Sequence, residues 1–338
     1  MAGTMNTPNR ARSVVAVVFA LLLFAAGTQA MAAPKPKSFG GQAAAPIAVQ
    51  TLKLRDDVYL LSTADGNVTM QLGDEGIVLA GAPGVVFSAA MGKAVQAISD
   101  APIRFVIDTS ADWSQGAGAQ FGSAFKRDDN NGQLLSQLGI STSTMRVIAQ
   151  ENVLSRMTTA RAANPNIVEM SVPTDAYFTA SMDFFFNGSP VEVIHLPAAH
   201  SDGDSAVFLR RSDVVSAGDV MDTTRYPVID RSSGGSITGL IAALNRILAI
   251  AVPAVPDEGG TLVVPGRGRV CDEIDVAEYR NMLVIIRDRI QDLVRRGMTR
   301  EQVYAAKPTL DYDGVYGADQ GSWTTRKFID AIYADLKQ

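Results

Sequence analysis

The sequence predicts a layered α/β fold, in which strands and helices together form one folded domain. Short β-branched and apolar runs, bounded by Gly, Asp or Pro, alternate with stretches whose apolar residues recur at helical spacing. The chain falls into two β-rich halves, each followed by helices, without a short-period repeat. Strands and helices in this order favour a layered α/β arrangement over separate domains.

The N-terminal residues carry the pattern of an export signal. Arg10 and Arg12 precede a 14-residue apolar run, residues 14–27, which is short for a membrane span, and a small-x-small sequence ends at Ala32. We therefore expect residues 1–32 to be a signal peptide of an exported protein, periplasmic or secreted. The alternative is an uncleaved membrane anchor. Residues 33–54 have the composition of a flexible linker, and residues 55–338 are expected to fold.

Composition limits the classes of partner. The chain of 338 residues has a net charge of −5 and no dense Lys/Arg stretch, so we expect no nucleic-acid binding. Once the signal peptide is removed, we expect no membrane-spanning segment in the chain. The single cysteine, Cys271, rules out an internal disulfide and is expected to be a small buried hydrophobe.

The elements follow in order along each half. In the first half, β-branched runs predict strands and helical spacing predicts helices: strands at 58–63, 67–73, 76–81, 103–109 and 145–150, with helices at 85–100, at 117–126 and from 151. In the second half the same criteria predict strands at 191–198, 206–211, 213–219 and 261–266, with helices at 237–251, 273–296, 299–306 and 323–336.

Four of the predicted strands end in polar loops. These loops are TSADWSQGAG (109–118), HLPAAHSDGD (195–204), SAGDVMDTTRYP (216–227) and VVPGRG (263–268). Polar groups delivered from strand ends converge on one edge of a sandwich, and convergent carboxylate and imidazole groups are what a metal site needs.

These loops, together with GNVTMQLGDEGIVL, PIRFVIDT and AGDVMDTTRYPVIDRSSGGS, carry a family resemblance over roughly residues 55–336. The chain resembles the metallo-β-lactamase superfamily, and specifically its exported metallo-hydrolases. The resemblance implies an αββα four-layer sandwich that includes the C-terminal helices. It also implies two metal ions, usually zinc, which activate a water at the edge between the sheets.

The chain departs from the family at most of the metal-ligand positions. The family's His-x-His-x-Asp-His motif follows a strand that ends in Thr, here Thr109. Its four ligand positions hold Ser110, Asp112, Ser114 and Gln115. The third histidine and the bridging aspartate are kept as His200 and Asp219, whereas Arg267 stands at the last histidine and Gly81 at a supporting aspartate.

The substitutions decide which ions can bind. On the family pattern, one ion uses the positions of Ser110, Asp112 and His200, and the other uses those of Ser114, Gln115 and Arg267, with Asp219 between them. Arg is always charged and has no lone pair to donate, so we expect the second site to be lost. Asp112, His200 and Asp219 could still hold one zinc, manganese or iron ion weakly. Alternatively, Asp112 and Asp219 accept hydrogen bonds from Arg267, whose charge then replaces that of the metal.

Two functions from different classes follow. The first is a non-hydrolytic protein without a cofactor, which binds a small molecule or an envelope protein in the old cleft. The second is a hydrolase with a single metal ion, held by Asp112, His200 and Asp219. Other nearby polar groups are expected to be structural. These are His195 on an apolar strand, Asp202 and Asp204 in a turn, and the loop 231–236 before a helix.

Overall fold

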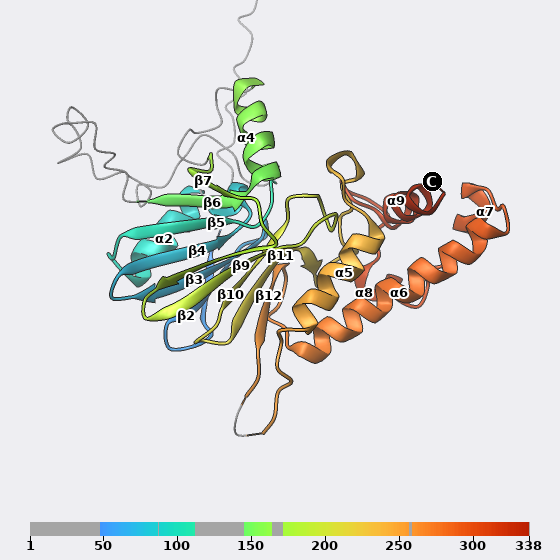
Figure 1. Ribbon diagram of the computed structural model, residues 1–338. Helices are drawn as coiled ribbons and strands as arrows, with labels where there is room; N and C mark the ends of the chain where they lie inside the picture. Colours follow the sequence, from blue (N-terminus) through green and yellow to red (C-terminus); the bar gives the residue numbers. More distant parts are fainter. Residues whose placement is uncertain (1–47, 87, 112–144, 164–171, 257–258, 338) are drawn as a thin grey trace, which may run out of the picture. The chain divides into compact units, whose positions relative to one another are not determined.

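Two β-sheets pack face to face at the centre of the protein (Figure 1). The computed structural model describes residues 48–86, 88–111, 145–163, 172–256 and 259–337, which belong to one compact unit. The predicted signal peptide and helix 117–126 lie outside these residues. None of the described helices is long and apolar enough to cross a membrane.

The first sheet follows the chain order of its strands. Its strands, as far as the structure describes the chain, are β1 (Gln50–Lys53), β2 (Val58–Ser62), β3 (Asn67–Gly73), β4 (Gly76–Gly81), β5 (Ile103–Asp108), β6 (Arg146–Gln150) and β7 (Asp175–Tyr177). Strands β1 to β4 pair antiparallel, and β4 to β7 pair parallel. The carboxyl ends of β4, β5 and β6 therefore lie at the same edge.

The second sheet is mostly antiparallel. Its described strands, in spatial order, are β12 (Leu262–Arg267), β11 (Val214–Asp222), β10 (Ser205–Leu209), β9 (Ser189–His195) and β8 (Ser181–Phe186). Only the β11–β12 pair is parallel. The carboxyl ends of these two strands therefore also meet at one edge.

Alternation along the strands builds the layer between the sheets. Val58 and Leu60 of β2 face inward and pack in one cluster with Val191 and Val193 of β9. Residues that differ by two point to the same face of a strand, so alternate residues of the central strands join this core.

Helices cover the outer faces of both sheets. The short helix α1 (Pro83–Val86), α2 (Ala89–Ile98) and α4 (Glu151–Ala163) pack on the first sheet. The second sheet is covered by α5 (Ile237–Leu248) and α6 (Glu273–Arg295), on which α9 (Thr325–Leu336) packs, with α7 (Arg300–Ala305) against α9 and the short α8 (Asp313–Tyr316) before it. The order helix, sheet, sheet, helix confirms the predicted αββα sandwich.

The helix boundaries have local causes. Ser236 caps α5 by accepting a hydrogen bond from the amide of Gly239 at 2.9 Å, as expected for the loop 231–236. Asp272 and Asp275 form a capping box at the start of α6. The apolar residues of α5 recur at i, i+3, i+4 and i+7, so a single face lies on the sheet: Ile237, Leu240, Ile241 and Leu244.

The structure corrects the sequence analysis at several elements. The predicted helix 85–100 is divided into α1 and α2. Gln50–Lys53, the end of the predicted linker, form β1 at the edge of the first sheet. The sequence analysis also missed β7, β8 and α8. The sequence does contain a signal for β8, the dipeptide Asn187-Gly188, which is typical of a two-residue hairpin turn. In the structure these residues follow β8 with φ of 52° and 68°, as such a turn requires.

Candidate functional site

Three of the polar loops, 195–204, 216–227 and 263–268, meet at one edge of the sandwich around a cleft of about 180 Å³. His200 follows β9, Asp219 and Asp222 lie at the end of β11, and Arg267 ends β12. Ser110, just after β5, reaches the same group through Asp219. The lining residues also include Met221, Arg225, Val228, Gly266, Ser322 and Trp323.

Ser110 and Asp219 form a direct bond across the edge. The hydroxyl of Ser110 donates to Oδ2 of Asp219 at 2.6 Å, and Ser110 is fully buried. A hydroxyl that donates to a carboxylate makes a short, charge-assisted hydrogen bond. The other oxygen of Asp219 lies against Gly266, where a Cβ would be 2.9 Å from Oδ1 and 2.7 Å from the carbonyl oxygen of Gly218. The side chain of Asp219 therefore depends on a glycine at position 266.

His200 is oriented by a buried carboxylate. Its Nδ1 lies 3.3 Å from Oδ1 of Asp204, which is fully buried. Asp204 also accepts hydrogen bonds from the amide and the hydroxyl of Ser201, at 2.6 and 2.9 Å. Since an ionised carboxylate only accepts, Nδ1 of His200 carries a proton in this contact. The prediction that Asp204 organises this turn is confirmed.

Arg267 forms its ion pair with a carboxylate that the sequence analysis did not consider. Its Nε lies 3.8 Å from Oδ2 of Asp222, and its Nη1 donates to the carbonyl oxygen of Ala64 at 3.1 Å. The predicted partners were Asp112 and Asp219. The side chains of Arg267 and Asp222 are only 14% and 8% exposed, so the pair is shielded from water.

Asp222 holds a second arginine as well. Nε of Arg225 donates to Oδ2 of Asp222 at 2.9 Å, the same oxygen that faces Arg267. The amide and hydroxyl of Thr224 donate to Oδ1 of Asp222 at 2.8 and 2.6 Å. Beneath the carboxylate, burial raises the pKa of Tyr279 well above its ordinary value, and its hydroxyl accepts from the amide of Asp222. Asp222 is therefore saturated with donors.

The structure brings together four of the seven predicted ligand positions. His200, Asp219 and Arg267 line one cleft, and Ser110 is bonded to Asp219. The other three positions lie outside the described residues: Asp112, Ser114 and Gln115.

Other predicted groups have structural roles. His195 is half-buried, and its Nε2 lies 2.8 Å from the carbonyl oxygen of Asp202, as predicted. Asp202 was predicted to bond to the backbone of its turn, but its side chain instead forms an ion pair with Arg156 of α4. At position 81, which the resemblance aligns with an aspartate, a Cβ would lie 3.1 Å from the carbonyl oxygen of Asn67, so Gly81 is closely packed.

Sequence reasoning missed three residues of the site. Asp222 and Arg225 lie in the quoted loop SAGDVMDTTRYP, and the spacing Asp-x-x-Arg could have indicated an ion pair. Trp323 comes from the turn before α9. No pattern in the sequence connects this turn with β11, because the contact depends on how the C-terminal helices pack.

The described donors do not fit a pair of metal ions. Of the four described positions, His200 and Asp219 have side chains that commonly bind metals. Ser110 directs its proton to Asp219, and Arg267 brings a positive charge. Within the described part of the chain there is no group of three or more His, Cys, Asp or Glu residues placed to hold an ion.

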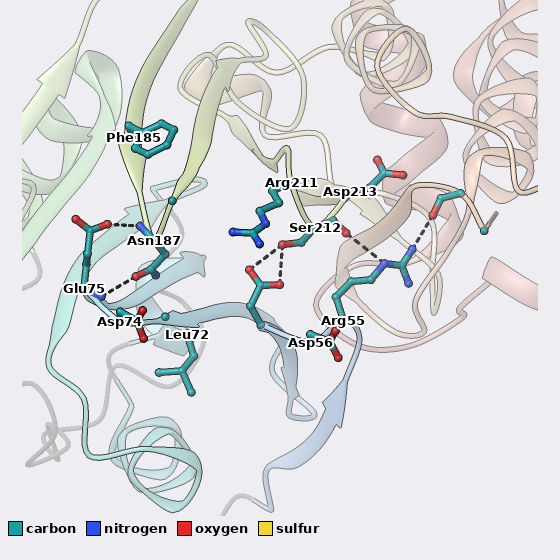
Figure 2. A pocket seen from close by; sticks show the side chains of 15 residues that line it. Arg55, Asp56, Leu72, Asp74, Glu75, Phe185, Asn187, Arg211, Ser212 and Asp213 are labelled. Carbon is teal, nitrogen blue, oxygen red and sulfur yellow. Dashed lines mark hydrogen bonds between the residues drawn. The ribbon is translucent and has the colours of Figure 1, made fainter.

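A larger cleft of about 1040 Å³ lies at the other end of the strands, between the hairpin turns (Figure 2). Arg55 donates to the carbonyl oxygens of Ser212 and Gly260 at 3.2 and 2.7 Å, and thus ties the two sheets together. The hydroxyl of Ser212 donates to both oxygens of Asp57. The polar groups at the centre of this cleft are therefore engaged in hydrogen bonds that hold the two sheets together.

No family model matches the chain, and no similar sequence was found among curated proteins. Solved structures do superpose on it. The sec-alkylsulfatase Pisa1 from Pseudomonas sp. has a TM-score of 0.55 and 15% identity, and the match covers 84% of this chain and 50% of that chain. A double mutant of the same alkylsulfatase gives a TM-score of 0.57 at 14% identity. A metallo-β-lactamase from Pontibacter korlensis has a TM-score of 0.47 and 13% identity over 70% of this chain and 99% of that chain.

The chain spans about half the length of the alkylsulfatase, so the likeness concerns the fold. Two facing sheets between helical layers, with polar strand ends gathered at one edge, are the arrangement that the quoted motifs predicted. The chain therefore has the αββα fold of the metallo-β-lactamase superfamily.

Proposed function

We propose that this chain is a non-hydrolytic binding protein that keeps the metallo-β-lactamase fold without its pair of metal ions. In this proposal the protein is exported by the signal at residues 1–32, and the cleft between β11 and β12 takes a small molecule. An envelope protein is the other class of partner that this location would offer.

The supporting observation is the arginine in the cleft. Arg267 stands at a ligand position, shares the cleft with Asp219 and forms an ion pair with Asp222. A divalent ion beside this guanidinium would be repelled in a poorly hydrated pocket, since a guanidinium keeps its proton at any physiological pH. Asp219 in turn accepts the hydroxyl of Ser110. In this proposal, the guanidinium of Arg267 and the hydroxyl of Ser110 take the place of the metal ions as partners of the carboxylates.

One observation favours the second candidate, a hydrolase with a single ion on Asp112, His200 and Asp219. The proton on Nδ1 of His200 points to Asp204, and metal-bound histidines usually have a carboxylate in this role. A single ion on such a site would lower the pKa of a bound water. The alkylsulfatase of similar fold suggests a sulfate ester as the substrate to try.

The metal content of the purified protein tests the proposal. We expect near-zero metal per chain after exposure to zinc, manganese and iron, measured by elemental mass spectrometry, and no hydrolysis of a sec-alkyl sulfate or a β-lactam. About one equivalent, lost in Asp219→Ala, would establish the single-ion hydrolase instead.

A reconstructed variant serves as the positive control. It combines Arg267→His with Ser110→His, Asp112→His, Ser114→Asp and Gln115→His, which restores the family's ligands on this backbone. We expect this variant to bind metal that the unmodified protein does not bind. Two ions in the unmodified protein would contradict both candidate functions.

A further inference from the structure

We propose that the cleft at the end of β11 and β12 binds an anionic headgroup, held by Arg225 and Arg267, with a short apolar group beside it. The inference rests on the proposed function, because it names the class of small molecule for the same cleft. The ligand class is a carboxylate, sulfate or phosphate that carries a small alkyl or aryl part.

The first argument is the number of donors. Both guanidinium groups turn Nε toward the same oxygen of Asp222, at 2.9 Å for Arg225 and 3.8 Å for Arg267. Nη1 of Arg267 donates to Ala64. Among the described residues, the two terminal nitrogens of Arg225 and Nη2 of Arg267 donate no hydrogen bond. Three nitrogens of two neighbouring guanidinium groups are thus available at one cleft.

The second argument is that the neighbouring carboxylates are already engaged. Oδ1 of Asp222 accepts two hydrogen bonds from Thr224, and its Oδ2 faces both arginines. Oδ2 of Asp219 accepts the hydroxyl of Ser110. In the group of Arg225, Arg267 and Asp222, two cations face one anion, and Asp219 is the second carboxylate that lines the cleft. The remaining N–H groups of the two arginines do not donate to these carboxylates, so a ligand can accept from them.

The chemistry of arginine selects the ligand. A guanidinium is planar, stays charged and presents pairs of parallel N–H groups, which match the paired oxygens of carboxylate, sulfate and phosphate. The side chains of Arg225 and Arg267 are only 26% and 14% exposed, and such bonds are stronger in a partly dehydrated site. An oxyanion therefore satisfies this cleft better than a neutral ligand does.

The walls of the cleft indicate the apolar part. Trp323, Val228 and Met221 line it beside the arginines. Apolar surface buried against these side chains adds roughly 25 cal/mol per Å² of free energy of binding. The volume of about 180 Å³ suits a small ligand rather than a folded partner. Together, these features describe a small amphiphilic anion.

Tryptophan fluorescence can follow the binding directly. The chain has two tryptophans, and Trp113→Phe leaves Trp323 in the cleft as the reporter. We expect a saturable change of fluorescence with hexyl sulfate, hexyl phosphate and hexanoate, and none with hexanol or hexylamine at equal concentration. The three anions together establish the shared chemistry, and their relative affinities show which oxyanion is preferred.

Variants assign the binding to the two arginines. Arg225→Gln and Arg267→Gln should each weaken binding of the preferred anion about 10- to 100-fold, as expected when a charge-assisted hydrogen bond is lost. Arg269→Gln is the matched control, because Arg269 is exposed, pairs with Asp275 and does not line the cleft. Its affinity should equal that of the parent, and thermal unfolding should show that all three variants fold.

The outcomes separate this inference from the proposed function. If the metal-free protein binds hexanol as tightly as hexyl sulfate, or if both arginine variants keep the parent's affinity, the anion site is wrong and the metal-free binding protein remains. If the protein holds a metal ion and hydrolyses hexyl sulfate, the proposed function is wrong. Metal content measured on the same sample decides between these results.

Discussion

At the scale of single residues, one arginine sets the charge at this edge of the sandwich. Arg267 ends β12, at the position that the resemblance aligns with a histidine, and its guanidinium reaches Asp222 and the carbonyl oxygen of Ala64. The sequence predicted that a cation stands in this pocket. It could not predict the carboxylate partner, because Asp222 lies three residues beyond the family's ligand and its orientation depends on Thr224 and Arg225.

Asp108 is a second residue whose environment has a measurable consequence. It lies at the end of β5, is fully buried, and neither of its carboxylate oxygens has a hydrogen-bond partner. Burial raises its pKa well above the ordinary value of 3.8. Between 3.8 and the folded pKa, the native state binds more protons than the unfolded state. Stability therefore falls as pH rises through this window.

We expect Asp108→Asn to remove this loss and to raise the free energy of unfolding at neutral pH by about 1–3 kcal/mol. Urea unfolding between pH 4 and pH 8 measures it. Asp175→Asn is the control of opposite sign. A hydrogen bond from Arg146 lowers the pKa of Asp175, so that carboxylate stabilises the fold above pH 3.8 and loses the effect as pH falls through its folded pKa. Equal pH profiles for the parent and Asp108→Asn would refute the assignment.

At the scale of elements, the sequence indicated most strands and helices because their apolar periodicity is strong. The inward residues of β2 and the single apolar face of α5 are examples. The misses have physical reasons. β7 has only three residues and β1 is exposed along its whole length, so neither shows a buried pattern. The three consecutive phenylalanines of β8 obscure its alternation.

The hairpin between β8 and β9 should be sensitive to the side chain at its turn. Gly188 has a φ of 68°, where a Cβ is strained. We expect Gly188→Ala to lower the free energy of unfolding by about 1 kcal/mol. Gly314→Ala in α8 is the matched control. A Cβ there meets nothing within 4 Å, and alanine favours a helix, so its stability should be unchanged or higher. Chemical unfolding of both variants makes the comparison. A Gly188→Ala protein as stable as its parent would argue against this turn.

At the scale of the whole molecule, the C-terminal helices are part of the sandwich and of its cleft. Tyr226, four residues beyond β11, stacks on Phe328 of α9 with ring centroids 4.5 Å apart. Its hydroxyl donates to Asp313 at 2.9 Å. Trp323, at the turn before α9, lines the cleft. The sequence predicted the helices at the C-terminus but not this contact, since residues about 100 positions apart form it through packing.

This contact predicts that stability and the cleft are coupled. Phe328 is fully buried, so Phe328→Ala should lower the free energy of unfolding by about 3–5 kcal/mol. The fluorescence of Trp323 and the far-ultraviolet circular dichroism should change together in one transition. Phe178→Ala, at a side chain that is 70% exposed, is the control and should have little effect. Two separate transitions in the parent protein would show that the C-terminal helices fold independently.

The guanidinium of Arg267 also bears on how this edge is assembled. A metal centre is completed only when ions are supplied from the surroundings, so its formation depends on their concentration. Here the positive charge belongs to a side chain of β12, so it is in place as soon as the chain folds. In the proposed metal-free protein, this corner of the sandwich would therefore form equally well where zinc is abundant and where it is scarce.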